Sequence, residues 1–391
     1  MLPPDIEGSY LCMGDVMIKG LQVILTLGAI LLLLLAVLAL LSPKMRESVR
    51  KIVHTYLQLT RYTRNPILLP RGGSYWESEA VFNPAALYED GRVHLLYRAV
   101  GPDGVSRFGY ASSGNGFNFN ERLPHPVFTS IAPRSIAPSE KKYSPVLYPS
   151  GGSWGGAEDP RMVVIDGRVY VTFNAFDGWD YLRVGVMSLS LDDFLVKRWC
   201  WDGPIFVSPP GEIHKNWVLF PEKLHGKFAV LHSITPEVQI DYVTDLNDLA
   251  DGTRTIRSRF EQKKNRNGWD MYVRSAGPPP IKTEYGWLVL YHAMEKNETS
   301  RYKLGAMLLD INEPTRVLHR AQAPILAPDA WYENDWKPGI VYSCGAIVKD
   351  NDLLVYYGGG DKTTCVAHAP LQEFLHALVT DAAPALNSEP L

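Results

Sequence analysis

The stretch NPAALYEDGRVHLLYRA, residues 83–99, has a close counterpart in DPRMVVIDGRVYVTFNA, residues 159–175. Each begins with a short polar residue and a proline, and continues through an apolar run to Asp-Gly. Each then returns through a second β-type run that is rich in aromatic residues. Because Asp-Gly between two such runs is a strong signal for a tight hairpin, the pair predicts two copies of one antiparallel unit.

Three further segments repeat this pattern: FPEKLHGKFAVLHS (220–233), PPIKTEYGWLVLYHA (279–293) and SCGAIVKDNDLLVYYGG (343–359). In four of the five units a third alternating stretch follows, such as RFGYASS after the first hairpin. The residues that follow the second strands are 58 to 76 positions apart: Arg98, Asn174, His232, His292 and Gly358. Five such units predict an all-β fold, a five-bladed β-propeller. A β-sandwich also has hairpins at regular spacing, but the equivalent strand starts in all five units favour the propeller.

Composition narrows the class of protein. The chain has 391 residues, 46% of them hydrophobic, which is enough for a large core. Its net charge of −3 gives no overall basic field, so we predict no nucleic acid partner. The four cysteines have no CxxC spacing and the chain has no HExxH motif, so neither a metal site nor a disulfide framework is predicted.

The first fifty residues differ in kind from the rest. Residues 20–41 carry no charge and are long enough, as a helix, to cross a bilayer. The sequence therefore predicts a single-pass membrane protein with an anchor at 20–42. Four basic residues follow the anchor and one precedes it, which predicts that the large domain after the anchor lies in the cytoplasm; the opposite orientation is the alternative. The predicted parts are a tail (1–19), the anchor (20–42), an amphipathic connector at the membrane surface (43–62), the propeller (63–380) and a C-terminal tail (381–391).

The propeller geometry predicts where a site would form. Equivalent ends of the first strands meet at one mouth of the central channel, which should bring together Asn83, Asp159, Lys223 and the 277–280 turn. The far ends of the second strands return to the same edge, so Arg98, Asn174, His232 and His292 should lie nearby. One pocket would then hold the carboxylate pair Glu158 and Asp159 together with several cations. Gly, Asp and Pro are also ordinary loop residues, so a plain turn is the alternative for Asp159.

Seven segments in order carry a specific resemblance: NPILLPRGGSYWESEAVFNPAA, LLYRAVG, GAEDPRMV, KNWVLFPEK, GPPPIKTEYGWLVLYHA, YKLGAMLLD and YYGGGD. From about Asn65 to Asp361 the chain resembles the β-mannoside phosphorylases of glycoside hydrolase family 130. The resemblance implies a five-bladed propeller and inverting phosphorolysis of terminal β-mannosides to α-mannose 1-phosphate. Inorganic phosphate is then a co-substrate, and no cofactor is implied.

The same resemblance implies residue roles. Asp159 would be the catalytic acid, which protonates the glycosidic oxygen through the 3-hydroxyl of the mannosyl unit. Phosphate would be bound by Arg98, Lys215, Asn216, Arg274, His292 and Tyr302. From their positions in the repeat and beside the acid, we predict that the mannoside is bound by Asn83, Glu158, Arg161, Lys223 and Asp361. Lys215 stands where the family pattern has arginine and Arg274 where it has lysine, so charge is kept while the bidentate geometry changes place.

Several readings of individual residues stay open. Arg161 could orient Glu158 or Asp159 instead of binding a ligand, and Lys223 could be a solvated surface residue. An inverting hydrolase needs a second carboxylate as base, whereas a phosphorylase needs cations to hold its anionic nucleophile. The retained cations favour the phosphorylase over a β-mannoside hydrolase. The presence of Asp159 counts against an inactive glycan-binding propeller, and the sequence leaves the linkage open.

Overall fold

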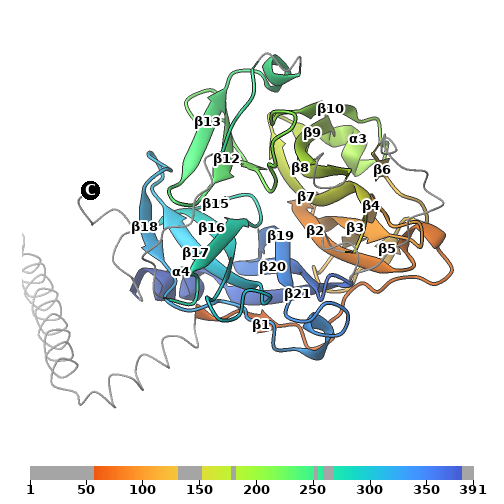
Figure 1. The fold of residues 1–391 in the computed structure, drawn as a ribbon. Coiled ribbons are helices and arrows are strands. Elements are labelled where there is room, and N and C mark those ends of the chain that lie inside the picture. The colour runs from red at the N-terminus through yellow and green to blue at the C-terminus, as the bar shows by residue number, and fades with distance from the viewer. Residues whose placement is uncertain (1–56, 131–151, 178–181, 251–253, 259–267, 381–391) are drawn as a thin grey trace, which may run out of the picture. The chain divides into compact units, whose positions relative to one another are not determined.

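A computed structural model describes residues 57–130, 152–177, 182–250, 254–258 and 268–380, which form five β-sheet blades around a common centre (Figure 1). Blade 1 contains β2 (Ala80–Glu89), β3 (Arg92–Val100), β4 (Val105–Ser113), β5 (Glu121–Arg122) and β6 (Phe128–Thr129). Blade 2 contains β7 (Gly155–Ile165), β8 (Arg168–Asp177), β9 (Leu182–Ser190) and β10 (Asp202–Phe206). Parallel pairing between β4 and β7 joins these two blades into one continuous sheet.

The other three blades follow in chain order. Blade 3 contains β11 (Val218–Leu219), β12 (Phe228–Ser233) and β13 (Gln239–Val243). Blade 4 contains β14 (Tyr272–Ala276), β15 (Ile281–Thr283), β16 (Gly286–Met294), β17 (Lys303–Leu309) and β18 (Val317–Arg320). Blade 5 contains β19 (Val341–Lys349), β20 (Asp352–Gly359) and β21 (Thr363–Pro370), with β1 (Thr60–Arg61) at its outer edge. The described helices are α3 (Leu191–Leu195), α4 (Leu371–Thr380), η1 (Tyr75–Glu77), η3 (Leu246–Leu249) and η4 (Trp331–Glu333).

The hairpin turns that reveal the repeat have the backbone that their residues favour. In four blades both central turn residues have positive φ: Asp90-Gly91, Asp166-Gly167, His225-Gly226 and Asp350-Asn351. Two successive positive φ values define the type I′ turn, whose twist matches that of the flanking strands. The local sequence thus sets the register of each hairpin.

A bulge in the innermost strand of blades 1 and 2 aims a polar side chain into the centre. The pairing of β2 with β3 shifts between Phe82 and Ala85, and that of β7 with β8 shifts between Glu158 and Arg161. Asn83 and Asp159, inside these shifts, have φ of 47° and 50°. Asparagine and aspartate tolerate this left-handed region better than other non-glycine residues, and bulges commonly re-aim side chains at active sites.

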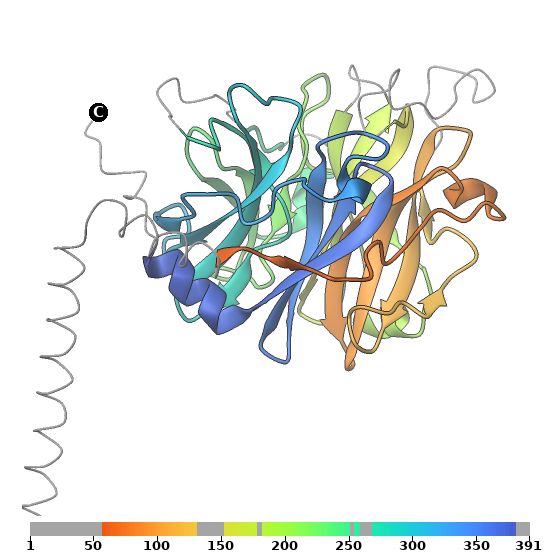
Figure 2. The same cartoon turned by 90° about the horizontal axis from the view of Figure 1, so that it is seen from below.

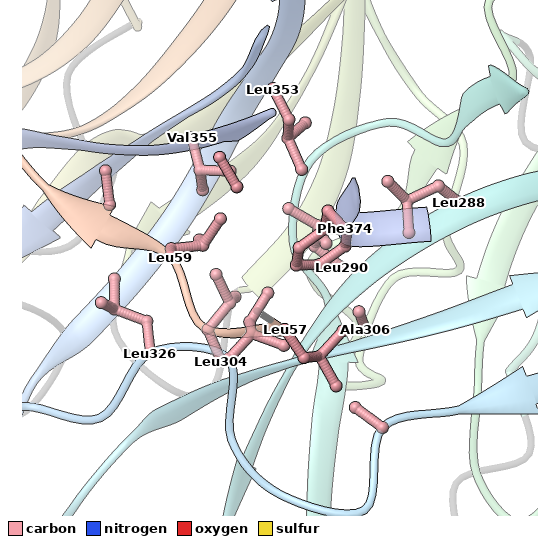
Figure 3. Packing of buried hydrophobic residues seen from close by; sticks show 14 of the residues in the cluster. Leu57, Leu59, Leu288, Leu290, Leu304, Ala306, Leu326, Leu353, Val355 and Phe374 are labelled. Atoms are coloured by element: carbon pink, nitrogen blue, oxygen red, sulfur yellow. The ribbon is translucent and has the colours of Figure 1, made fainter. Parts of the chain in front are cut away.

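The ring is closed by residues from both ends of the described chain. Thr60 and Arg61 pair with His368 and Ala367, so β1 becomes the outer strand of blade 5 beside β21 (Figure 2). Leu57 and Leu59 are buried in an apolar cluster with residues of blades 4 and 5 and with Phe374 of α4 (Figure 3). This closure ties the first blade-forming residues to the last.

Two features of the sequence-based organisation are corrected by the structure. Among the helices of the described ranges, none has the length and apolar character needed to span a bilayer. The prediction of a membrane-spanning helix and of a single-pass membrane protein is therefore wrong on this finding, and the stretch on which it was based, 20–42, lies outside the described residues. Of the predicted connector, residues 57–62 belong to the propeller edge, because Leu57 and Leu59 find apolar partners there.

Leu59→Ala is expected to reduce the free energy of unfolding by about 2–5 kcal/mol, because it leaves a cavity in the closing cluster. Leu59 is 5% exposed, whereas Leu69, ten residues on, is 53% exposed and serves as the matched control. Urea unfolding of the two alanine variants measures the difference. Equal stability of both variants would contradict a stabilising role for this closure.

Candidate active site

The carboxylate of Asp159 lies at the centre of a polar network drawn from two blades. Asn83 Nδ2 donates to Asp159 Oδ1 at 2.8 Å, and Arg98 Nη1 lies 3.2 Å from the same oxygen. Asn174 Nδ2 approaches the other oxygen, Oδ2, at 3.5 Å. The bulges therefore bring together four residues that the propeller geometry predicts at one mouth.

Glu158 is engaged by protein groups on one side of this network. Its Oε1 accepts a hydrogen bond from Arg98 Nη2 at 2.7 Å and from Ser153 Oγ at 2.9 Å. Arg98 also donates from Nε to Ser106 Oγ at 2.9 Å, and it is only 1% exposed. Arg98 thus links both carboxylates, and this geometry favours an orienting role for Glu158 over a direct sugar contact.

Arg161 holds the bulge at Asp159 in place through hydrogen bonds to backbone carbonyl groups. Its Nη1 donates to the backbone carbonyl of Asp159 at 2.7 Å and its Nε donates to that of Gly277 at 2.9 Å. Its Nη2 lies 3.1 Å from Asn216 Oδ1. Because Arg161 is buried and its guanidinium is directed at these acceptors, the structure favours the positioning alternative over substrate binding for this residue.

The charges around Asp159 set its protonation. Burial raises the pKa of Asp159, but the guanidinium groups of Arg98 and Arg161, the Asn83 amide and the Lys215 ammonium together bring it below its usual value. The free enzyme therefore holds Asp159 as a carboxylate at neutral pH. To act as an acid, Asp159 must gain a proton when its electrostatic surroundings change.

A pocket of about 340 Å³ adjoins this network on the side of blades 3 and 4. Four of the predicted phosphate ligands line it: Lys215, Asn216, Arg274 and Tyr302. Asn216 joins the pocket to the network, because its Oδ1 accepts a hydrogen bond from Asn174 Nδ2 at 2.9 Å. The Arg274 guanidinium lies 5.9 Å from the centre of the Tyr302 ring. Burial lowers the pKa of Lys215, as do the nearby Arg274 and Arg98, whereas Asp159 and Glu158 oppose this shift.

His292 lies behind Tyr342 and is fully buried. The two rings stack at 4.0 Å with an interplanar angle of 6°, and Tyr342 itself lines the pocket. His292 Nε2 accepts a hydrogen bond from the backbone N–H of Ser343 at 2.9 Å, which places the ring proton on Nδ1. Burial, with a smaller contribution from Arg161, lowers the pKa of His292 to about 3. Among the described residues Nδ1 has no hydrogen-bond partner, so it is a neutral donor still to be satisfied.

Between pH 6.5 and 5 the stability of the protein is expected to fall, partly because His292 stays neutral in the fold. In the unfolded chain this histidine binds a proton with a pKa of about 6.5, whereas in the folded protein it stays neutral. Each such histidine therefore lowers the free energy of unfolding by up to about 1.4 kcal/mol for every pH unit below that value. Urea unfolding at pH 7.0, 6.0 and 5.0 measures the slope. His292→Gln should flatten it, and an identical slope in that variant would contradict the assignment.

Asp361 forms an ion pair that the sequence does not reveal. Lys337 Nζ lies 3.0 Å from Asp361 Oδ2. Burial lowers the pKa of Lys337, but the Asp361 carboxylate opposes this, and with a contribution from Tyr302 the pKa of Lys337 lies above its usual value. Lys337 also interacts electrostatically with Tyr302 and Arg98, which places Asp361 near both the pocket and the Asp159 network.

Lys223 does not join the site. Its Nζ pairs at 2.8 Å with Asp166, which belongs to the turn at the opposite end of β7 from Asp159. The repeat pattern predicts that blade 3 starts at Phe220, because a proline follows that residue. In the structure the innermost strand is β11, and Asn216 (φ 65°) takes the position equivalent to Asn83 and Asp159. Of the two readings left open for Lys223, the structure therefore favours a solvated surface residue.

Sequence reasoning missed several polar residues of the site. Ser106 and Ser153 bind Arg98, Tyr342 covers His292, and Lys337 pairs with Asp361. Lys337 and Ser153 lie in loops outside the repeated hairpins, so the repeat carried no signal for them. Asn174 was placed at the mouth by the repeat but given no role. No group of three His, Cys, Asp or Glu within the described part of the chain is placed to hold a metal ion.

The comparisons with known proteins concern the family and the fold. The model of the β-1,4-mannooligosaccharide phosphorylase family, glycoside hydrolase family 130, matches residues 57–380. The chain is 36% identical over 322 residues to a 1,2-β-oligomannan phosphorylase of Thermoanaerobacter sp., which spans 80% of this chain and 97% of that relative. It is 33% identical over 324 residues to a β-1,2-mannobiose phosphorylase of the same organism, over 79% of this chain and 96% of the relative. The solved β-1,2-mannobiose phosphorylase of Listeria innocua aligns with a TM-score of 0.61 at 24% identity, over 82% of this chain and 99% of that one, which shows the shared fold.

A carboxylate-and-arginine network beside a cationic pocket, at the centre of a five-bladed propeller, is an arrangement that suits a glycoside-processing enzyme. The chain belongs to glycoside hydrolase family 130, the β-1,4-mannooligosaccharide phosphorylase family. The predicted resemblance is confirmed, and so is the predicted class of enzyme, a mannoside phosphorylase with phosphate as its co-substrate.

Proposed function

We propose that this enzyme catalyses the inverting phosphorolysis of terminal β-1,2-linked mannosides to α-mannose 1-phosphate. The observation that carries the linkage is the 36% identity, over nearly the whole of the relative, to a 1,2-β-oligomannan phosphorylase. A β-1,4-mannooligosaccharide phosphorylase of Ruminococcus albus is 28% identical over a shorter region, 55% of this chain. Phosphorolysis is the activity of the two relatives that are 36% and 33% identical to this chain.

Asp159 is proposed as the proton donor. An oxygen of phosphate attacks the anomeric carbon, the glycosidic C–O bond breaks, and the departing oxygen takes the proton of Asp159 through the mannosyl 3-hydroxyl. Glu158 is already held by Arg98 and Ser153 and is not needed as a base, because phosphate is an anionic nucleophile. Asn83 and Asp361 are proposed to bind the mannosyl hydroxyls beside Asp159.

The pocket wall of Lys215, Asn216, Arg274 and Tyr302 is proposed to hold the phosphate. Arg98 and His292, the other two predicted phosphate ligands, do not line this pocket, and we propose that they support it from behind Glu158 and Tyr342. A phosphate dianion there offsets the cations that depress the pKa of Asp159, so its binding raises that pKa and favours the protonated acid. His292 stays neutral behind Tyr342, so it adds no further positive charge to this pocket. Phosphate therefore serves as nucleophile and also prepares the acid.

The test is an assay of the full chain on β-1,2-mannobiose, β-1,2-mannotriose and β-1,4-mannobiose, each with and without inorganic phosphate. We expect phosphate-dependent α-mannose 1-phosphate from the 1,2-linked substrates, at rates at least tenfold above those on the 1,4-linked one. Preference for β-1,4-mannobiose would overturn the linkage. Free mannose formed equally without phosphate would identify a hydrolase.

Lys337→Met is expected to raise KM for the mannoside by about 10- to 100-fold, since hydrogen bonds to charged groups contribute about 1.5–3 kcal/mol. The variant leaves Asp361 without its 3.0 Å partner at the sugar side of the site. KM for phosphate should change much less. Lys337→Arg keeps the charge and should recover most of the affinity; equal loss in both variants would show that the exchange merely disrupts the loop.

A further inference from the structure

Two side chains that carry hydroxyl groups, Ser275 and Tyr342, line the pocket beside the proposed phosphate ligands. They come from neighbouring blades, since Ser275 belongs to β14 of blade 4 and Tyr342 to β19 of blade 5. Ser275 interacts with the phenol of Tyr342, so the two hydroxyl groups are close to each other. We call these two residues the hydroxyl pair. Neither the repeat nor the family resemblance assigns a role to either residue.

The hydroxyl group of Ser275 lacks a partner in the part of the chain that the structure describes. Its Oγ is buried, yet no hydrogen-bonding group there lies within reach. The strand fixes its position, because Ser275 follows Arg274 directly and pairs with His292 across blade 4. Burying a hydroxyl group without a partner is unfavourable, so a ligand that supplies one would bind there with a gain.

Tyr342 connects the pocket to the Asp159 network. Its ring stacks on that of His292 at 4.0 Å and lies 6.0 Å from the ring of Tyr302. Its phenol lies within electrostatic range of both Arg161 and Asp159. Burial raises the pKa of Tyr342 well above its usual value, so the phenol keeps its proton at neutral pH. It is therefore a neutral group beside the acid.

The other groups of the proposed phosphate site leave one need unmet. Lys215 and Arg274 only donate hydrogen bonds, and the amide oxygen of Asn216 already accepts from Arg161 and Asn174. Inorganic phosphate keeps at least one proton at neutral pH, so it requires an acceptor as well as donors. A hydroxyl group can act as either. The hydroxyl pair thus offers hydrogen bonds that the cations and the amide do not.

We propose that the hydroxyl pair binds the inorganic phosphate, one hydroxyl group accepting from its P–OH group and the other donating to a neighbouring phosphate oxygen. This inference rests on the proposed function, because it completes the same phosphate site. Held in this way, phosphate keeps its unprotonated oxygens free to attack the anomeric carbon. Ser275 and Tyr342 are then phosphate ligands that orient the nucleophile without adding positive charge.

The test compares Ser275→Ala and Tyr342→Phe with the parent full chain, using β-1,2-mannobiose and varied inorganic phosphate. Each variant loses one hydroxyl group, and the phenylalanine ring can keep the stack on His292. We expect KM for phosphate to rise about 10- to 100-fold in each, the usual effect of losing a hydrogen bond to a charged group. KM for the mannoside and the midpoint of urea unfolding should change little. Ser275→Thr keeps the hydroxyl group and should recover most of the affinity for phosphate.

Two further variants separate the possible outcomes. Tyr285→Phe removes a hydroxyl group from a residue that is 39% exposed in the turn between β15 and β16, and it should leave both KM values unchanged. Lys215→Met tests the phosphate site itself. If KM for phosphate rises in Lys215→Met but not in both hydroxyl variants, the inference is wrong and the proposed function stands. Equal increases in KM for phosphate and for the mannoside in the hydroxyl variants would likewise overturn the inference.

Failure of the function beneath the inference has a different signature. A parent chain that forms no α-mannose 1-phosphate from β-1,2-mannobiose would overturn the proposed function. An unchanged KM for phosphate in Lys215→Met would show that phosphate does not bind in this pocket. The inference would be overturned in both cases.

Discussion

Asp159→Asn is expected to lower kcat/KM for phosphorolysis by about 10²–10⁴-fold, the contribution typical of a positioned general acid. The amide keeps the shape of the carboxyl group, so Asn83 and the bulge should remain in place while the transferable proton is lost. Rates with inorganic phosphate and a β-1,2-mannoside measure the effect. The free energy of unfolding, measured alongside, should remain within about 1–2 kcal/mol of the parent, an ordinary effect for one substitution.

The control for this prediction is Glu158→Gln, at the adjacent position. Glu158 is held by Arg98 and Ser153, so its exchange should reduce the rate far less than that of Asp159. A substrate with a good leaving group, such as an aryl β-mannoside, needs little protonation and should recover most of the rate in Asp159→Asn. If Glu158→Gln is the more damaging change and the aryl substrate gives no recovery, Asp159 is not the acid.

The blades could be predicted from the sequence because their turns are local. Asp90-Gly91 and Asp166-Gly167 fix their hairpins through backbone preferences that any reader of the chain can apply. The convergence of Asn83, Arg98, Asp159 and Asn174 followed from topology alone once the repeat was counted. Position in the repeat was therefore the informative quantity at these four residues.

The errors arose where that local signal was ambiguous. In blade 3, the proline after Phe220 resembled the Asn-Pro and Asp-Pro starts of the first two blades, and Lys223 was placed at the mouth on that ground. Asn216, just before β11, is not followed by a proline, so only its positive φ reveals the true equivalence. Leu57 and Leu59 have helical spacing, yet tertiary contacts with blades 4 and 5 decide their place. Lys337 reaches Asp361 from a loop, where no periodicity applies.

Arg98→Met is expected to reduce the free energy of unfolding by about 3–5 kcal/mol at pH 7, the usual cost of breaking a buried ion pair from one side. Arg98 is 1% exposed and lies within 2.7 Å of Glu158 and 3.2 Å of Asp159, so both buried carboxylates lose their guanidinium. Urea unfolding measures the loss. The double variant Arg98→Met/Glu158→Gln removes one uncompensated charge, so it should regain part of the lost free energy of unfolding.

The pH dependence of this loss distinguishes an electrostatic cause from simple repacking. With Arg98 present, the pKa of Asp159 lies below its usual value, so Asp159 contributes stability at neutral pH that is lost as the pH falls through that depressed pKa. Without Arg98, the first-named charge that opposes burial is gone, so the pKa of Asp159 is expected to rise and protonation to relieve the buried charge as the pH falls. The gap in stability between parent and variant should therefore narrow from pH 7 to pH 5.

Arg122→Met, which breaks the buried pair of Arg122 with Glu77 in blade 1, should be destabilised similarly while its folded fraction keeps activity. A gap that is constant with pH would assign the loss to packing, and full activity of Arg98→Met would remove Arg98 from the site.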